Sequence, residues 1–210
     1  MQPGGHRLRR EVVERHQRER ILAGAAKAIA QEGYRQASVA DIVKSAAIAR
    51  ARFYENFSSK QDCFFSLYDE SAAAALEVVS EACRAETESE FPDRVRVALE
   101  ALVTYLASDP VLARAIIVEG PAVGPPITSR FEGVIGGFAD LVKRGRPESS
   151  AVELPDTIEE TVVGGLYWLL YYAFLEESPK SVEEMLPQLT EFLLLPFVGA
   201  EAARRATATT

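Results

Sequence analysis

Apolar residues recur with the helical period of 3.6 along most of this chain. Within residues 11–32, Ile21, Leu22 and Ile29 fall on one face, and Gly33 follows where a helix C-terminus often has a glycine. No segment of the sequence alternates apolar and polar residues with a period of two over a useful length. The pattern therefore predicts an all-α protein.

The same periodicity predicts the remaining helices in chain order. Two short helices lie between residues 38 and 57, and a longer one runs from Ser59 to about residue 89. Further helices follow Pro92 and Pro110 and span residues 127–144, 156–177 and 180–197. No apolar run approaches the roughly 20 residues that cross a membrane, so we expect no membrane partner.

Residues 38–62 predict a helix-turn-helix unit. Ser38 with Asp41, and Ser59 with Asp62, fit the capping box. In that motif the serine oxygen accepts the third amide of the helix, and the acidic side chain reaches back to the serine N–H. A short helix, a tight turn, a second short helix and a fresh helix start therefore follow one another here.

The second short helix has two different faces. Phe53 and Phe57, spaced i and i+4, share one face, so the two short helices must share a core and cross at a steep angle. Four side chains lie off that face: Arg50, Arg52, Tyr54 and Asn56. These are the types of side chain with which a protein reads the DNA major groove.

Charge is divided unevenly along the chain. The first 60 residues hold 12 Lys and Arg against six Asp and Glu, which is +6, whereas the whole chain carries −8, so residues 61–210 carry −14. Neutralisation of phosphates is local, so a basic head can bind double-stranded DNA although the sequence pI is near 5.0. The alternative for the basic run alone is a solvated charged face.

Other classes of protein gain little support from the sequence. Cys63 and Cys83 are the only cysteines and fall in expected helices, so a reducing, cytoplasmic location is predicted. The basic N-terminus has no apolar stretch behind it, unlike a secretory signal. Two histidines near the N-terminus do not make a metal cluster, and no GxSxG or HExxH motif occurs. We expect no catalytic residue, no metal and no cofactor.

Two stretches, RERILAGAAKAIAQEGY and VADIVKSAAIARARFYENFSSKQDCF, resemble the DNA-binding head of TetR-family transcriptional regulators. The stretch LPQLTEFLLLPFVG is similar to the last helix of many members. The resemblance covers essentially the whole chain, and the first 65 residues are its specific part. It implies an Ω-shaped, all-helical homodimer that binds a palindromic operator and is released by a small-molecule effector.

The resemblance also implies roles for single residues. Arg50 and Arg52 fall where members of the family read bases. Arginine suits that role because its guanidinium offers a bidentate fork to guanine. The expected phosphate contacts are Ser38, Tyr54, Asn56 and Lys60.

The chain departs from the family pattern in the turn. Members usually have glycine where this chain has Ala47, because that position favours a positive φ, and a Cβ there costs about 1 kcal/mol. The second short helix usually opens with Ser or Thr, whereas Ala49 offers no side-chain cap. A small residue or Thr is common where Arg52 stands.

Three regions are expected: a helix-turn-helix DNA-binding domain at 1–62, a helical ligand-binding and dimerisation domain at 63–200, and a disordered tail at 201–210. The last two long helices are apolar on too many sides for exposed helices, which favours a homodimer interface. The alternative is that both helices are simply core. The expected interface residues are Gly165, Leu169, Tyr172, Leu189, Phe192 and Leu193.

The body is rich in aromatic residues, which line apolar ligand pockets in many proteins. The expected ligand-binding residues are Tyr68, Tyr105, Phe131, Phe138, Trp168 and Tyr171. The alternative for each of them is ordinary core filling. Glu119, beside Gly120, is expected to be a solvated helix end, and the alternative is a polar group inside the body.

The residues and the resemblance favour a DNA-binding regulator, expected to be a repressor that an apolar or aromatic effector releases. A second hypothesis is a helical ligand-binding or protein-interaction module that has lost operator recognition, which Ala47 and Ala49 keep open. A third is an all-helical enzyme of unfamiliar type. Adjacent pairs such as Glu159 and Glu160 give it no support, because their carboxylates point in different directions on a helix and are expected at the surface.

Overall fold

The computed structural model describes residues 4–86, 88–146, 154–176 and 182–207, with side chains from residue 13 onward. Every regular element in these ranges is a helix, so the all-α expectation is confirmed. The α-helices are α1 Gly4–Glu32, α2 Val39–Ala46, α3 Arg50–Asn56, α4 Lys60–Ala85, α5 Phe91–Ser108, α6 Pro110–Ile117, α7 Thr128–Gly145, α8 Ile158–Leu175 and α9 Leu186–Thr207. Short 3-10 helices are η1 Gly120–Val123, η2 Pro125–Ile127 and η3 Val182–Met185.

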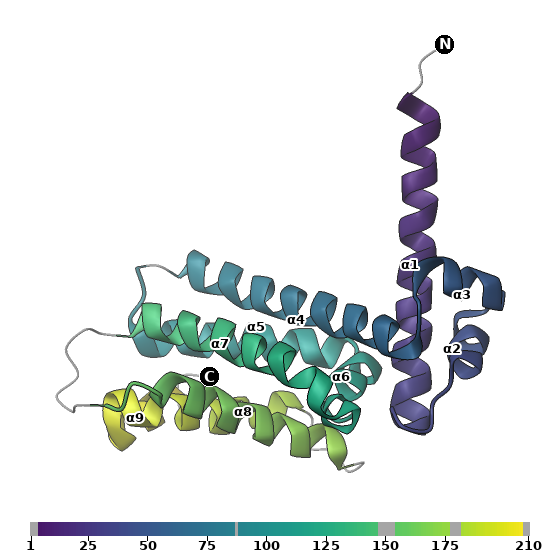
Figure 1. Ribbon diagram of the computed structural model, residues 1–210. Helices are drawn as coiled ribbons and strands as arrows, with labels where there is room; N and C mark the ends of the chain where they lie inside the picture. The colour runs from purple at the N-terminus through teal and green to yellow at the C-terminus, as the bar shows by residue number, and fades with distance from the viewer. Residues whose placement is uncertain (1–3, 87, 147–153, 177–181, 208–210) are drawn as a thin grey trace.

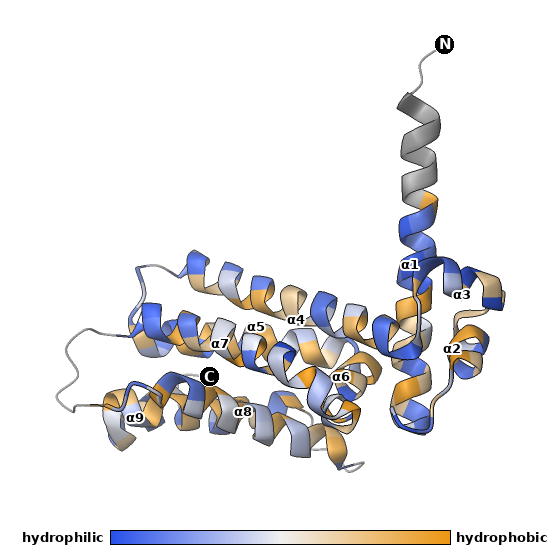
Figure 2. Cartoon of the chain, in the orientation of Figure 1, coloured by the Kyte–Doolittle hydropathy of each residue, from blue (hydrophilic) through white to orange (hydrophobic). Residues whose placement is uncertain are grey.

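The helices form a small head and a longer body (Figure 1). In the head, α1 stands at a steep angle to the body helices, and α2 and α3 lie beside it. In the body, α4, α5, α7, α8 and α9 run alongside one another, and α6 lies at the end nearest the head. Each body helix carries both hydrophobic and hydrophilic residues (Figure 2). No helix in the described ranges is long and apolar enough to cross a bilayer.

The head and the start of α4 share one core. Phe64, Leu67 and Tyr68 of α4 are buried in the same cluster as Ile21 of α1 and Phe53 of α3. A second core fills the rest of the body, chiefly between α5, α8 and α9. The boundary expected between residues 62 and 63 therefore falls inside a helix whose first turns belong to the head core.

The closest approach in the head is between α1 and α2, at Gly24. A Cβ added at Gly24 would lie 2.6 Å from the Ala46 Cβ and 2.7 Å from the Ala46 nitrogen. Neither atom is the end of a flexible side chain, so the two helices would have to move apart. A glycine at this point of α1 allows the helix-turn-helix to dock.

The C-terminal segment corrects the expected disordered tail at 201–210. The chain stays helical to Thr207, and only residues 208–210 lie outside the described part. Gly199, with φ of 77° and ψ of 166°, bends α9. Beyond the bend Ala203 is fully buried in the body core, and Arg204 pairs with Glu191 at 3.1 Å. The helical period of the sequence did not predict the burial of Ala203, because its side chain is small and follows the bend at Gly199.

Glu159 corrects a second expectation. It was expected at the surface with Glu160, yet only 3 % of it is exposed. Its Oε1 lies 2.8 Å from the Nε of Arg146, at the end of α7. The pair holds the C-terminal end of α7 against the first turn of α8, and a buried carboxylate needs such a partner.

We predict that Gly24→Ala destabilises the protein by about 1–3 kcal/mol, because overpacking outweighs the better helix propensity of alanine. Urea unfolding measures the effect. The control is Gly133→Ala in α7, where an added Cβ meets nothing within 4 Å. That control should stabilise by about 0.5–1 kcal/mol. If both variants were stabilised alike, the close approach would not constrain the head.

Candidate functional site

Serine caps fix the starts of α2 and α4, the helices before and after α3. The Ser38 hydroxyl accepts the Asp41 N–H at 3.3 Å, and Asp41 Oδ2 accepts the Ser38 N–H at 2.9 Å. The capping box expected at α2 is confirmed. Hydrogen bonds from Ser38 lower the pKa of the Asp41 carboxyl, because they favour its charged form.

The second expected box is only half present. Ser59 accepts the Asp62 N–H at 3.1 Å, as expected. The Asp62 carboxylate, however, accepts from Ser58, through the backbone N–H at 2.8 Å and the hydroxyl at 2.9 Å. These bonds lower the pKa of Asp62. The Asp62 carboxylate thus accepts the backbone N–H of Ser58, one residue before the Ser59 N–H that the capping-box pattern predicts.

The turn between α2 and α3 has a positive φ at position 47, as the family pattern predicts, although this residue is an alanine. Ala47 is left-handed, with φ of 51° and ψ of 51°. Ala49 precedes α3 without a side-chain cap. Arg20 Nη2 of α1 donates to the carbonyls of Ala46 and Ala47, each at 3.0 Å. A long-range arginine therefore supports a turn that local sequence disfavours.

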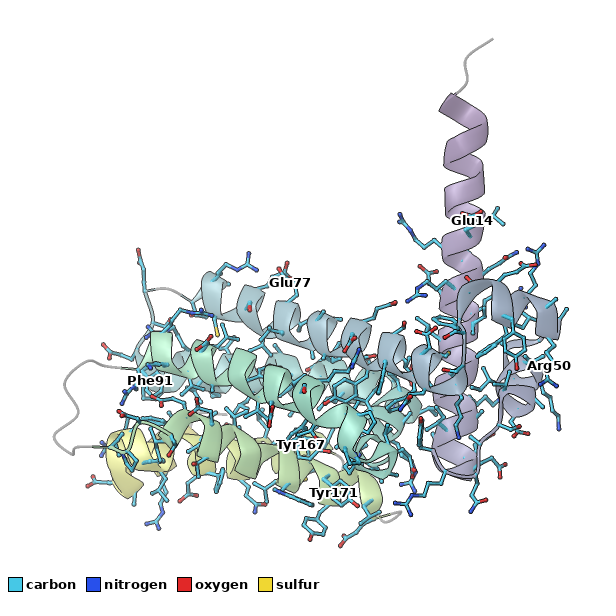
Figure 3. The ribbon with its side chains drawn as sticks, viewed as in Figure 1. Glu14, Arg50, Glu77, Phe91, Tyr167 and Tyr171 are labelled. Carbon is cyan, nitrogen blue, oxygen red and sulfur yellow. The ribbon has the colours of Figure 1, made fainter. Side chains whose placement is uncertain are left out.

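The α3 helix packs through its phenylalanines and presents its other face to solvent. Phe53 and Phe57 are 0 % and 2 % exposed, with ring centroids 5.9 Å apart. Arg50 and Arg52 are exposed, and Tyr54 is 48 % exposed. Arg50 lies at the outer edge of the head, away from the body (Figure 3). The two residues expected to read bases are therefore both accessible to solvent.

All four side chains of α3 that were expected to contact DNA have partners within the helix. Arg50 Nη2 donates to the Tyr54 hydroxyl at 3.3 Å, and its guanidinium lies 5.6 Å from the ring centroid. Arg52 Nη1 pairs with Glu55 Oε2 at 2.7 Å. The Asn56 amide donates to the Arg52 carbonyl at 2.9 Å. An exposed ion pair contributes about 0–1 kcal/mol, so separating Arg52 from Glu55 costs little.

Lys60 braces the link between α1 and α2. Its Nζ donates to the carbonyls of Tyr34 and Ala37, at 2.6 and 2.7 Å, and lies 4.5 Å from the Tyr34 ring centroid. Burial lowers the pKa of Lys60. The side chain expected to contact phosphate thus has two of its three N–H donors engaged inside the head.

The head is fastened to α6 by polar contacts at the end of α1. The Tyr34 N–H donates to Glu119 Oε2 at 2.8 Å. Arg114 of α6 donates to the Ala30 carbonyl at 3.4 Å and to the Phe174 carbonyl at 2.6 Å. The expectation that Glu119 is a solvated helix end was wrong, because it accepts a backbone amide of the head.

The body contains an inner cavity of about 160 Å³ beside α6. Of the expected ligand-binding residues, Tyr68, Tyr105 and Phe138 line it. The structure adds Tyr167, whose hydroxyl donates to the Ile117 carbonyl at 2.8 Å. Burial raises the pKa of Tyr68 to about 12 and also raises that of Tyr167. No local pattern distinguished Tyr167 from its aromatic neighbours in the sequence.

An outer cavity of about 560 Å³ lies farther from the head, between α4, α5, α7 and α8. Phe91 of its wall is at the far end of the body, whereas Tyr167 is nearer the head (Figure 3). Three expected ligand-binding residues line neither cavity: Phe131, Trp168 and Tyr171. Phe131 packs on Tyr167 with centroids 4.7 Å apart, and Trp168 is 53 % exposed.

The expected dimer-interface residues divide into two groups. Leu189 and Leu193 are 1 % and 4 % exposed and pack in the core of their own protomer, which corrects their expected place at an interface. Tyr172 and Phe192 are exposed, whereas Gly165 and Leu169 are partly buried. The apolar face exposed on α8 and α9 comprises Trp168, Tyr172, Leu175, Phe192 and Leu195. The 3.6-residue period located both helices but did not separate their buried sides from their exposed sides.

A capped helix-turn-helix with an exposed basic α3, fastened to a helical body with apolar cavities, defines a DNA-binding regulator. Residues 21–67 match the family model of bacterial regulatory proteins of the tetR family. The helix-turn-helix region of this chain is therefore similar to that of TetR-family transcriptional regulators.

Relatives and solved structures resemble the rest of the chain. The transcriptional activator FasR of Mycolicibacterium smegmatis is 24% identical over 145 residues, which are 67% of this chain and 65% of that protein. The fatty acid degradation regulator FadR of Bacillus halodurans has a TM-score of 0.73 at 19% identity, covering 84% of this chain and 97% of that one. FadR of Bacillus subtilis, solved with stearoyl-CoA, has a TM-score of 0.71 at 18% identity, covering 86% and 98%. These structures share the fold.

We predict that Glu55→Gln strengthens binding to a random-sequence DNA duplex by a factor of about 2 to 10 at low salt, because it removes a negative charge and frees Arg52. Arg52→Gln should weaken binding and lower the salt slope by about 0.9. Fluorescence anisotropy at several salt concentrations measures both. The control, Glu100→Gln, removes the carboxylate of the Arg96 pair in α5. Unchanged affinity in both α3 variants would place DNA on another surface.

Proposed function

We propose that this protein represses transcription as a homodimer on a palindromic operator and that an apolar ligand in the body releases it. The observation that carries the proposal is the double role of α6. Leu112 and Ile116 of this helix line the inner cavity, and Arg114 together with Glu119, just beyond it, holds the end of α1. A ligand that moves α6 therefore acts on the head directly.

Operator binding supplies the reason why such a movement matters. Two α3 helices of a dimer must match half-sites about 34–36 Å apart, or a multiple of that distance. A ligand that prefers another spacing lowers DNA affinity by the factor by which DNA lowers ligand affinity. Selection of bound fragments from genomic DNA, with and without cell extract, tests the proposal. Recovery of no enriched palindrome under either condition would contradict it.

Support for the class of ligand comes from relatives. The Bacillus subtilis FadR structure holds stearoyl-CoA, and the Bacillus halodurans protein is a fatty acid degradation regulator. The apolar walls of the inner cavity suit an acyl chain.

FasR is a transcriptional activator, so activation is the second candidate. A promoter fused to a reporter separates the two: deletion of the regulator raises expression under repression and lowers it under activation.

We predict that Trp168→Glu yields a monomer that binds the operator weakly. A dimer through the exposed faces of α8 and α9 would bury that charge without a partner, at a cost of several kcal/mol. Sedimentation velocity reports the oligomeric state. Val111→Glu is the control, because Val111 is 46 % exposed on α6 and is not one of the residues of that face. A dimeric Trp168→Glu variant with unchanged operator affinity would rule out this interface.

We predict that Glu119→Ala uncouples ligand from DNA. Loss of the acceptor for the Tyr34 N–H should bring the ratio of operator affinities, without and with stearoyl-CoA, toward 1. Operator affinity without ligand should change much less. Glu119→Gln keeps an acceptor oxygen and should keep most of the coupling. The measurement is a pair of operator titrations for each variant. Equal coupling in wild type and both variants would exclude Glu119 from the path.

A further inference from the structure

The two body cavities share a wall. Phe138 of α7 and Val163 and Leu166 of α8 line both of them. Val163 and Leu166 are 7 % and 6 % exposed and belong to tightly buried positions of α8, whereas Phe138 is only partly buried. The Phe138 ring is therefore the part of the partition that can turn aside most easily.

The outer cavity has a cationic lining in an acidic body. Arg84, Arg94 and Arg144 line it, and no Asp or Glu is among its lining residues. Residues 61–210 carry a charge of −14, so a cavity lined by three arginines and by no Asp or Glu differs in charge from the surrounding body. Arg84 pairs with Glu77 at 2.7 Å, outside the lining, and donates to the Ser80 carbonyl. Arg94 donates to the carbonyls of Ser89 and Gly145. Their remaining N–H groups suit an anionic group.

The inner cavity offers mainly apolar surface instead. Several of its polar groups have partners within the protein: the Tyr105 hydroxyl donates to the Ser71 carbonyl at 3.3 Å, and Asp109 accepts the Leu112 N–H at 2.9 Å. Tyr167 is bonded to the Ile117 carbonyl. The main favourable contribution to ligand binding in this cavity is therefore the burial of hydrocarbon surface.

We propose that the two cavities form one site for an anionic amphiphile with a long unbranched chain. The anionic head binds the arginines of the outer cavity, and the chain passes Phe138 into the inner cavity beside α6. A fatty acid carboxylate and a phosphate-bearing acyl thioester share this chemistry. The inference rests on the proposed function, since it names the ligand class and its orientation in the body.

This orientation makes release depend on chain length. A short chain fills the outer cavity and leaves Leu112 and Ile116 of α6 untouched. A chain that extends past Phe138 reaches α6, and through Arg114 and Glu119 it acts on the head. Binding and release of DNA are thus separate properties of one ligand series, with Phe138 at the threshold between them.

The first experiment tests the anionic head. Octadecanoate, stearoyl-CoA and methyl octadecanoate are titrated against the full-length protein, wild type and the double variant Arg84→Gln/Arg144→Gln. The control, Arg96→Gln, removes an arginine of α5 that lines neither cavity. The double variant should lose about tenfold or more in affinity for the anions, as expected for charge-assisted hydrogen bonds. Binding of the ester should be weak and unchanged.

The anion that binds more tightly to the wild-type protein identifies the source, carboxylate or thioester. Equal affinities of anions and ester, or equal losses in the double variant and the Arg96→Gln control, would overturn the cationic head site.

The second experiment tests the partition with Phe138→Trp and Phe138→Ala. Anions of 6 to 18 carbons with the preferred head are assayed for binding and for release of operator DNA. Phe138→Trp should keep the binding of short chains but require longer chains, or fail, for release. Phe138→Ala should lower the chain length at which release begins. An identical threshold in all three proteins would overturn the partition, and thermal unfolding confirms that each variant is folded.

The outcomes separate this inference from the proposed function. Release of the operator by uncharged and charged chains alike, independent of the arginines, would leave the regulator intact and reject the amphiphile site. Arginine-dependent, length-dependent binding with no effect on DNA would retain the site and reject ligand-controlled release.

Discussion

The backbone of Tyr34 is the point on which the relation of head to body depends. Its N–H is bonded to Glu119, which follows α6, and its carbonyl is bonded to Lys60, at the start of α4. The residue sits just after the left-handed Gly33, with φ of 79°, where α1 ends. Two body-linked side chains thus hold the segment from which α2 and α3 extend. These two bonds help to fix the direction of the exposed face of α3.

The polar contacts around Tyr34 also explain why a helical body can influence a surface on another side of the molecule. The end of α1 lies between the first turn of α4 and the end of α6, so a displacement of either helix is imposed on it. Farther along both helices, α1 is also held to α4 by the ion pair of Arg18 with Glu70 at 2.7 Å. A joint held at several points moves as a unit.

Local signals in the sequence were enough for the helix-turn-helix and its exposed face. Caps at Ser38 and Ser59 and the Phe53–Phe57 pair act within a few residues, so periodicity and capping rules find them. Features made by distant residues were missed. Glu119 meets Tyr34 and Glu159 meets Arg146 only once the chain is folded, and Leu193 faces its own core rather than an interface. The residues that line the inner cavity were predicted only in part. The helical period places Tyr68, Tyr105 and Phe138 in the body together with aromatic residues that do not line the cavity, and it does not distinguish the two groups.

Ala47 carries a consequence for how the head acquires its structure. A left-handed alanine is not specified by its own sequence neighbourhood, and the carbonyls beside it are satisfied by Arg20, more than 25 residues earlier in the chain. A peptide limited to α2 and α3 would lack that arginine and would sample other turns. The angle between the two helices is therefore acquired only after α1 has docked. Folding of the DNA-reading unit is a tertiary event in this protein rather than a local one.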